Sequence, residues 1–223
     1  MPDQSITAIP GGASAQQILG LLRELSATEP DAAAAEAWGL IDRLRERATH
    51  DRDGAAESLN ELFAIGTTPT GLDGPTDGML VATTTTPALD AAATALTKNW
   101  MPWRGKSFNA ADNTGENRMT DSSTIVGKLL WPLYSMKSGS DGKAAFDFET
   151  FTEAGKEDPD VSVLVINYES VSSNPALIIR SIRDELVELV PGTYLGKIFF
   201  RTPSLPGVQP TFSRIGFFAL RTK

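Results

Sequence analysis

Apolar residues gather in runs in the second half of the chain, and polar turn residues separate these runs. Three of the runs follow one another at residues 161–168, 176–190 and 193–200. The segments SSNP and PG lie between them. Short runs rich in β-branched and aromatic residues, joined by turns of this kind, are typical of consecutive antiparallel strands. We therefore expect the centre of the fold to be a meander of strands.

The first third of the chain has a helical pattern instead. After a flexible lead at residues 1–13, Ser14 is placed as an N-cap, and apolar residues recur at one-face spacing in Ile18, Leu21, Leu22 and Leu25. Residues 32–48 form a second helix, and a third begins at Asp53 as N-cap. We predict a helical segment over residues 14–66 whose apolar stripes pack on the β part. A partner protein, or a second copy in a homodimer, is the alternative occupant of those stripes.

The remaining strands follow a Gly- and Pro-containing linker at residues 67–75. Strands are expected at residues 78–86, 144–151 and 214–221, with a strand or loop near 125–134 and a polar loop at 109–120. An alanine-rich helix at 87–98 is expected to plug or cover the barrel. Closing the last strand onto the first removes both sheet edges. The sequence predicts an α+β fold: N-terminal helices packed on an antiparallel, lipocalin-like β-barrel of about eight strands over residues 76–223, wide enough for one small ligand.

Composition and charge disfavour several classes of partner and site. The formal net charge of -8 disfavours nucleic acid and anionic membrane surfaces as partners. No apolar run of ~18 residues is present, so we expect no membrane insertion. The chain has no cysteine, and its one histidine is His50 at an expected helix end. We therefore predict no metal site and no cofactor, and a cytoplasmic location. The common nucleotide-binding, zinc-protease and acyl-transfer motifs are also missing.

Charged residues interrupt the apolar run at 176–190. Alternation places Asp184 on one strand face and both Arg183 and Glu185 on the other. These charges either form outward salt bridges or send one charge into the barrel. A buried charge requires a partner there, and it can recognise the polar group of a ligand or act as a general acid or base.

Aromatic residues supply the other candidates. Tyr168 and Tyr194 are expected on neighbouring strands, where a hydroxyl near Lys197 or Arg201 would fix a polar ligand group. Trp103 is either a core anchor or part of the mouth of a pocket. Core tyrosines with satisfied hydroxyls are the alternative to a binding role.

Several of these segments together resemble a known family. The run Trp103–Phe108 (WRGKSF), Asn117, Tyr168, Asn174-Pro175, Arg183-Asp184-Glu185 and Tyr194–Lys197 (YLGK) resembles small bacterial lipocalin-like (calycin-type) β-barrel proteins with a WxGK-type motif near the barrel entrance. The likeness covers residues 76–223. Gly78-Met79-Leu80 stands where that family has GxW, without the tryptophan. The resemblance implies a barrel with an internal ligand cavity and no particular reaction.

These observations predict binding of a small apolar or amphipathic molecule, such as a lipid, in the barrel. Phe199, Phe217, Leu195 and Ile166 are expected to line the cavity, with Trp103, Tyr168, Tyr194 and Arg183 as further ligand contacts. A cofactor-free cyclase or isomerase that uses a Tyr or a carboxylate to move a proton is one alternative. A protein that binds a partner through its N-terminal helices is the other.

Overall fold

The structure is a computed structural model that describes residues 14–84, 103–123, 133–139, 141–176, 178–202 and 210–222. The expected lead at residues 1–13, the helix at 87–98 and nearly all of the strand or loop at 125–134 lie outside these ranges. Within them the fold is α+β, as predicted: three N-terminal helices precede an antiparallel β-barrel.

The helices are α1 (Ala15–Ser26), α2 (Pro30–Arg47) and α3 (Arg52–Ala64). Ser14 caps α1 as predicted, and it forms a capping box in which its side chain and that of Gln17 each accept the other's backbone N–H. The N-cap of α3 is Asp51 and not Asp53, because the Asp51 carboxylate accepts the N–H of Gly54. Among the described residues, no helix combines the length and apolar character needed to cross a membrane.

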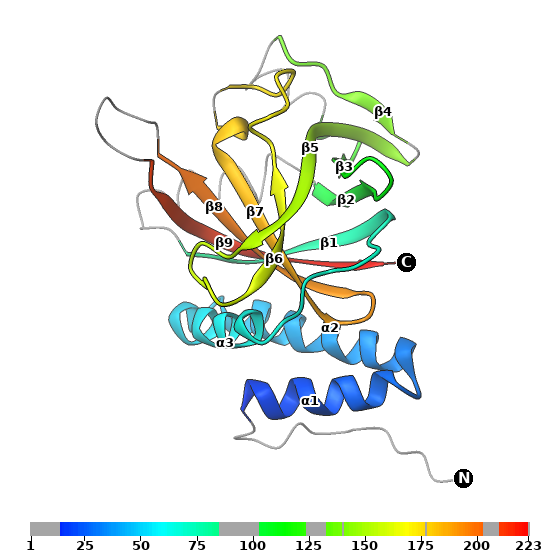
Figure 1. The fold of residues 1–223 in the computed structure, drawn as a ribbon, viewed down its shortest axis with the longest axis vertical. Helices are drawn as coiled ribbons and strands as arrows, with labels where there is room; N and C mark the ends of the chain where they lie inside the picture. The colour runs from blue at the N-terminus through cyan, green and yellow to red at the C-terminus, as the bar shows by residue number, and fades with distance from the viewer. Residues whose placement is uncertain are drawn as a thin grey trace.

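Nine strands form one antiparallel sheet within the described residues, and the pairing of β3 with β5 closes it into a barrel of eight strands, with β4 as an extra strand on β5. The sheet order is β3-β2-β1-β9-β8-β7-β6-β5-β4, so the last strand pairs with the first, as predicted. Figure 1 shows the helices gathered on one side of this barrel. The strands are β1 Gly74–Thr83, β2 Trp103–Asn109, β3 Thr114–Met119, β4 Lys137–Gly139, β5 Gly142–Ala154, β6 Ser162–Asn167, β7 Ile182–Val190, β8 Thr193–Arg201 and β9 Phe212–Thr222.

Two strand predictions need correction. The segment 109–120 is not a polar loop throughout, because β3 lies within it. Its alternation is hidden, since the inward positions of β3 include Gly115 and Asn117, which are not apolar. The long run at 176–190 is not one strand either. Ile178 has φ 72°, which turns the chain into a short 3₁₀ helix, Ile179–Ser181, and β7 begins only at Ile182.

The barrel wall is buried on both faces over much of its length. The first core joins the helices to the outer face of the barrel, with Leu19, Ile41 and Phe63 against residues such as Val187 and Leu195. The second core fills the barrel interior with residues of seven strands and the turns beside them, including Phe108, Phe148, Ile166, Leu186 and Phe218. The helical stripes are therefore used for packing on the barrel, as expected, although Leu21 is 49% exposed and lies off the buried stripe.

Candidate functional site

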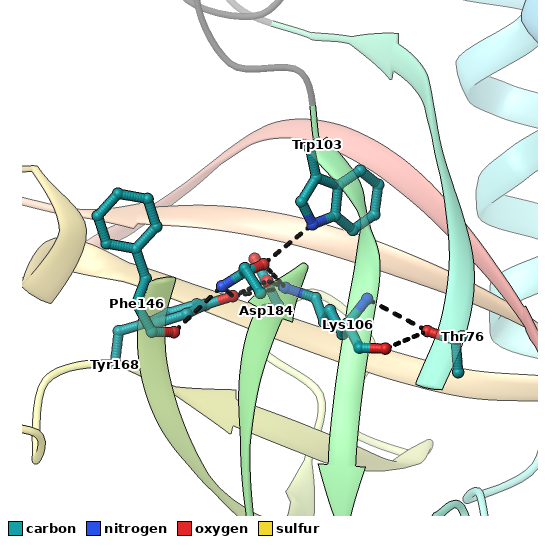
Figure 2. A network of polar contacts seen from close by, with 7 residues as sticks. Thr76, Trp103, Lys106, Phe146, Tyr168 and Asp184 are labelled. Atoms are coloured by element: carbon teal, nitrogen blue, oxygen red, sulfur yellow. Dashed lines mark hydrogen bonds and ion pairs between the residues drawn. The ribbon is translucent and has the colours of Figure 1, made fainter. Parts of the chain in front are cut away.

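A buried polar cluster lies inside the barrel and joins strands that are far apart in the sequence (Figure 2). We call it the inner cluster: Trp103, Lys106, Asn117, Tyr168 and Asp184. The Lys106 ammonium lies 2.9 Å from Asp184 Oδ2, 3.0 Å from Asn117 Oδ1 and 2.5 Å from the Tyr168 hydroxyl. The side chains of Lys106 and Asp184 are only 3% and 6% exposed. The cluster is therefore a charge pair removed from water.

Further hydrogen bonds close the network. The Tyr168 hydroxyl donates to Asp184 Oδ2 at 3.1 Å, and the Trp103 indole N–H donates to Asn117 Oδ1 at 3.0 Å. The Asn117 amide donates to the Tyr168 hydroxyl at 3.1 Å and to the backbone carbonyl of Phe146 at 3.2 Å. Each member thus fixes the orientation of another, which holds the cluster rigid.

The local backbone explains this convergence. Trp103 begins β2, Asp184 lies near the start of β7, Asn117 lies near the end of β3, and Tyr168 directly follows β6. Antiparallel order brings these four positions to one end of the barrel. Lys106 also joins the cluster, because the preceding Gly105 lets β2 approach β1 closely. Gly105 has φ 139°, and a Cβ atom on it would lie 2.1 Å from the carbonyl oxygen of Thr76.

A β-bulge shapes β5, the strand that pairs with β3. Phe146 and Asp147 of β5 lie between two ladder pairs where β3 has only Glu116, and Phe146 has φ 55°. This conformation costs free energy in a residue other than glycine and is held by the surrounding structure. The bulge turns the Phe146 carbonyl toward the Asn117 amide.

The electrostatics follow from burial. Burial lowers the pKa of Lys106, and the neighbouring Asp184 carboxylate opposes this shift. Burial raises the pKa of Tyr168 well above its usual value, and the charge of Asp184 adds to that shift. Four aromatic rings surround the Lys106 ammonium at 5.2 to 5.6 Å from their centroids, those of Trp103, Phe148, Tyr168 and Phe218. These rings supply cation–π stabilisation in place of water.

One atom of the cluster is left without a donor. Asp184 Oδ1 is buried and accepts no hydrogen bond from the part of the chain that the structure describes. Most buried polar atoms in native proteins have a partner, so an exception of this kind marks a site that can accept a further donor. The arrangement is able to hold a hydroxyl or amide N–H, or to exchange a proton among the amine, phenol and carboxylate.

The predicted site residues divide between the two faces of the barrel wall. Trp103 and Tyr168 belong to the inner cluster. Tyr194 also faces the interior but lies toward the other end of the barrel, where burial and the neighbouring Glu188 raise its pKa to about 12. The expected adjacency of the tyrosine strands is wrong, because β7 lies between β6 and β8.

The other three predicted site residues lie on the outer face of the barrel wall. Phe217 packs in the first core, against the helices, together with Leu195. Phe199 is fully buried and shares the strand face of Leu195. Arg183 lies on the outer face, paired with Glu185 and Glu153. Of the four expected cavity-lining residues, only Ile166 belongs to the interior core.

Lys106, Asn117 and Asp184 were not among the expected ligand contacts, although all three lie in the segments that resemble lipocalin-like barrels and Asp184 was one of the charges that could enter the barrel. A signal for Lys106 was available, since alternation places it on the same face of β2 as the apolar Phe108. Asp184 had already been placed opposite Arg183 and Glu185 on β7. The alternation along β7 does not show which of its two faces points into the barrel.

Two hollows border these faces. One, of about 470 Å³, lies at the seam where β3 pairs with β5, and its lining includes Phe108, Phe148 and Gly115. Phe148 is also one ring around Lys106, so this hollow adjoins the inner cluster. The other, of about 210 Å³, lies on the outer face beside Arg183. Among the described residues, no group of His, Asp or Glu side chains is arranged to hold a metal ion.

Comparison with known proteins gives one structural likeness. No family model matches the chain, and no curated protein matches its sequence. A solved structure described as a protein from Thermomonospora curvata superimposes with a TM-score of 0.42 at 14% sequence identity, covering 82% of this chain and 97% of that one.

Proposed function

We propose that the barrel binds a small apolar or amphipathic molecule whose polar group donates a hydrogen bond to Asp184 Oδ1. The observation that carries this proposal is that atom: a buried carboxylate oxygen with no donor among the described residues, inside an aromatic interior. A hydroxyl or amide N–H of a ligand would supply the hydrogen-bond donor for this oxygen. Hydrogen bonds to charged groups contribute about 1.5–3 kcal/mol.

The hollow at the β3–β5 seam supports an amphipathic ligand body, because its lining combines Phe108, Phe148 and Val171 with polar and charged side chains such as Glu116, Lys137 and Asp147. Its volume of about 470 Å³ falls within the range of roughly 300–1,000 Å³ that is usual for small-molecule sites. Phe108 and Phe148 belong to its wall, although they are only 5% and 0% exposed, and the Phe148 ring centroid lies 5.5 Å from the Lys106 ammonium. The resemblance of the sequence segments around Trp103 and Tyr168 to lipocalin-like barrels favours the same class of ligand. Trp103 and Tyr168 are then contacts near the polar group.

A fluorescence experiment tests the proposal. The apolar dye N-phenyl-1-naphthylamine is bound to the full chain and displaced by nonan-1-ol or by its methyl ether, which lacks the donor. We expect the alcohol to compete about tenfold or more tightly. The double variant Lys106→Met/Asp184→Leu replaces the ion pair by apolar groups and should remove this preference. Asp42→Asn/Arg45→Gln, which removes an exposed pair on α2, serves as the control.

Two outcomes would contradict the proposal. The first is a native protein that does not bind the dye. The second is equal competition by the alcohol and the ether on the native chain, since the donor to Asp184 would then make no contribution.

A second candidate function rests on the contact between Tyr168, Lys106 and Asp184. An amine whose pKa is lowered and a phenol whose pKa is raised lie within hydrogen-bond distance of one carboxylate. This set suits proton transfer in a cofactor-free isomerase or cyclase. Deuterium uptake from D₂O at the α-carbon of a cyclic ketone, faster than in buffer and lost in the double variant, would favour this candidate.

Association through the helices remains a separate prediction. The buried stripes of the three helices face the barrel, so a homodimer or another partner would have to use the outer side of α1 around Leu21. Light scattering of the native chain and of Leu21→Lys would show whether such a contact forms.

A further inference from the structure

The outer face of the barrel carries a second polar hollow directly behind the inner cluster. Arg183 and Asp184 are adjacent on β7 and point to opposite sides of the wall. The hollow of about 210 Å³, which we call the outer pocket, is lined by four cationic side chains, Lys156, Arg180, Arg183 and Arg201, and by two carboxylates, Glu153 and Glu169. With Glu185, which pairs with Arg183 from behind the lining, four cations face three carboxylates, and this leaves a local excess of one positive charge on a chain whose net charge is -8.

Arg183 is held in place by a buried anchor. Its Nε lies 2.8 Å from Glu185 Oε1, and Glu185 is fully buried. The same carboxylate accepts the backbone N–H of Lys156 at 3.1 Å, which ties the turn after β5 to β7. Burial raises the pKa of Glu185, and Arg183 opposes that shift. The rest of the guanidinium group faces Glu153, with the buried Nη2 atom 2.8 Å from Glu153 Oε2.

A strained turn presents the second arginine. Ile178 is β-branched and has φ 72°, a conformation that such residues rarely adopt. The 3₁₀ helix that follows contains Arg180, whose Nε donates to the carbonyl oxygen of Glu169 at 3.1 Å. The turn thus sets Arg180 beside Arg201, which pairs with the Glu169 side chain at 2.5 Å.

The two pocket carboxylates differ in how firmly they are held. The Glu153 and Glu169 side chains are 43% and 46% exposed, and they pair with Arg183 at 2.8 Å and Arg201 at 2.5 Å. Exposed ion pairs contribute only about 0–1 kcal/mol, because water solvates both partners. This applies more closely to the pair of Glu169 with Arg201 than to the pair of Glu153 with Arg183, since the Arg183 side chain is only 10% exposed. An incoming anion can therefore replace the Glu169 carboxylate at Arg201, while Arg180 stays bound to the Glu169 carbonyl and Arg183 stays bound to Glu185.

The lining and size define the ligand. The Phe212 ring lies in the pocket wall, with the Lys156 ammonium 5.3 Å and the Arg183 guanidinium 5.9 Å from its centroid. The volume is below the usual range for drug-sized ligands, so the ligand must be small. We infer that the outer pocket binds a small organic anion with a flat apolar face, such as an aromatic carboxylate, between its arginines and Phe212.

Calorimetric titration of the full chain with sodium benzoate tests this inference, with inorganic phosphate as a second probe. Benzoate should bind with one-to-one stoichiometry and more tightly than phosphate. Arg180→Gln and Arg201→Gln should each weaken benzoate binding about tenfold or more, since each removes a charged hydrogen-bond donor. Arg45→Gln, which removes an exposed arginine on α2, should leave binding unchanged.

The inference fails if benzoate gives no binding to the native chain. It also fails if both arginine variants, with unfolding midpoints like that of the native chain, bind benzoate as the native chain does. Phosphate binding as tightly as benzoate would overturn the aromatic part. The Lys106→Met/Asp184→Leu variant should still bind benzoate, because its changes lie on the inner face. The outer pocket therefore stands or falls independently of ligand binding inside the barrel.

Discussion

The two faces of β7 both carry buried charges, and they stabilise these charges in different ways. Arg183, Asp184 and Glu185 are consecutive, and all three are buried. On the inner face, Asp184 is paired with Lys106, which is itself buried. On the outer face, Arg183 has one buried partner, Glu185, and one half-exposed partner, Glu153. The exposure of the partner, rather than of the charge itself, therefore determines how much stability is lost when a single charge is deleted.

The physical reason lies in what remains after a deletion. An ion pair taken out of water repays its desolvation only while both charges are present. Without Lys106, the Asp184 carboxylate would keep a hydrogen bond from Tyr168 and no cation of the inner cluster. Without Arg183, Glu185 would still accept the Lys156 backbone N–H, and its raised pKa makes protonation easy. The inner pair should therefore be the less tolerant of the two.

The largest expected effect is that of Lys106→Met. This change leaves the buried Asp184 carboxylate without its cation, so the free energy of unfolding should fall by about 3–5 kcal/mol. Urea unfolding followed by tryptophan fluorescence measures it. Lys137→Met removes a lysine from the more exposed pair with Asp147 and should cost about 0–1 kcal/mol.

The double variant Lys106→Met/Asp184→Leu sharpens this result. It removes both charges, so it should recover most of the lost stability, since replacing a buried ion pair by apolar groups of similar volume is often neutral. A double variant less stable than Lys106→Met alone would contradict a cost that arises from the unpaired carboxylate.

Arg183→Met should have a smaller and pH-dependent effect. We expect about 1–3 kcal/mol near pH 8, where Glu185 is left charged and buried. Burial already raises the pKa of Glu185, and removal of Arg183 should raise it further. Because the folded-state pKa exceeds the unfolded one, the carboxyl group favours folding at low pH and loses that contribution as the pH rises through its folded pKa. The cost of the variant should therefore be smaller at pH 4 than at pH 8.

Unfolding curves for the native chain and Arg183→Met at both pH values provide the measurement. The adjacent Glu153 acts in the same direction: although burial works against it, Arg183 lowers the pKa of Glu153, and this benefit disappears with the arginine. A cost that stays constant or shrinks as the pH rises would show that the outer cluster behaves like the inner one.

Part of this comparison could be predicted from the sequence. Alternation along β7 placed Asp184 opposite Arg183 and Glu185, and apolar periodicity predicted the helices and the closed antiparallel barrel. It could not identify the inward face, because the helices and the turn after β5 bury the outer face as well. Phe199, Phe217 and Leu195 were assigned to the cavity for that reason. Period-2 patterning separates two faces but cannot label them when both are apolar.

The inner cluster needed information that no local pattern contains. Its members come from the ends of separate strands, and their meeting depends on the ladder register. The bulge at Phe146 and Asp147 and the turn at Ile178 both interrupt regular alternation. Asn117 was missed because its strand looks polar. A charged residue at an inward position, such as Lys106 beside Phe108, was one local signal of the site, and the resemblance to lipocalin-like barrels was another, since its segments contain all five residues of the inner cluster.

The smallest expected effect is spectroscopic and concerns the inner face. The chain has three tyrosines, and burial raises the pKa of each: Tyr134, Tyr168 well above its usual value, and Tyr194 to about 12. Unfolded tyrosines ionise near pH 10. The folded-state pKa values are higher, so the tyrosines favour folding below about pH 10 and that contribution is lost as the pH rises through the folded pKa values.

Absorbance at 295 nm should therefore stay nearly flat past pH 10 in the native chain and rise at pH 10 in urea. Tyr194→Phe should remove one ionisation near pH 12 and leave that of Tyr168, whose pKa burial and the Asp184 charge raise well above its usual value. Tyr168→Phe should leave the Tyr194 ionisation in place. Ionisation of Tyr168 or Tyr194 at pH 10 in the folded chain would mean that water reaches the interior, and the difference between the two faces of β7 would then be smaller than their burial implies.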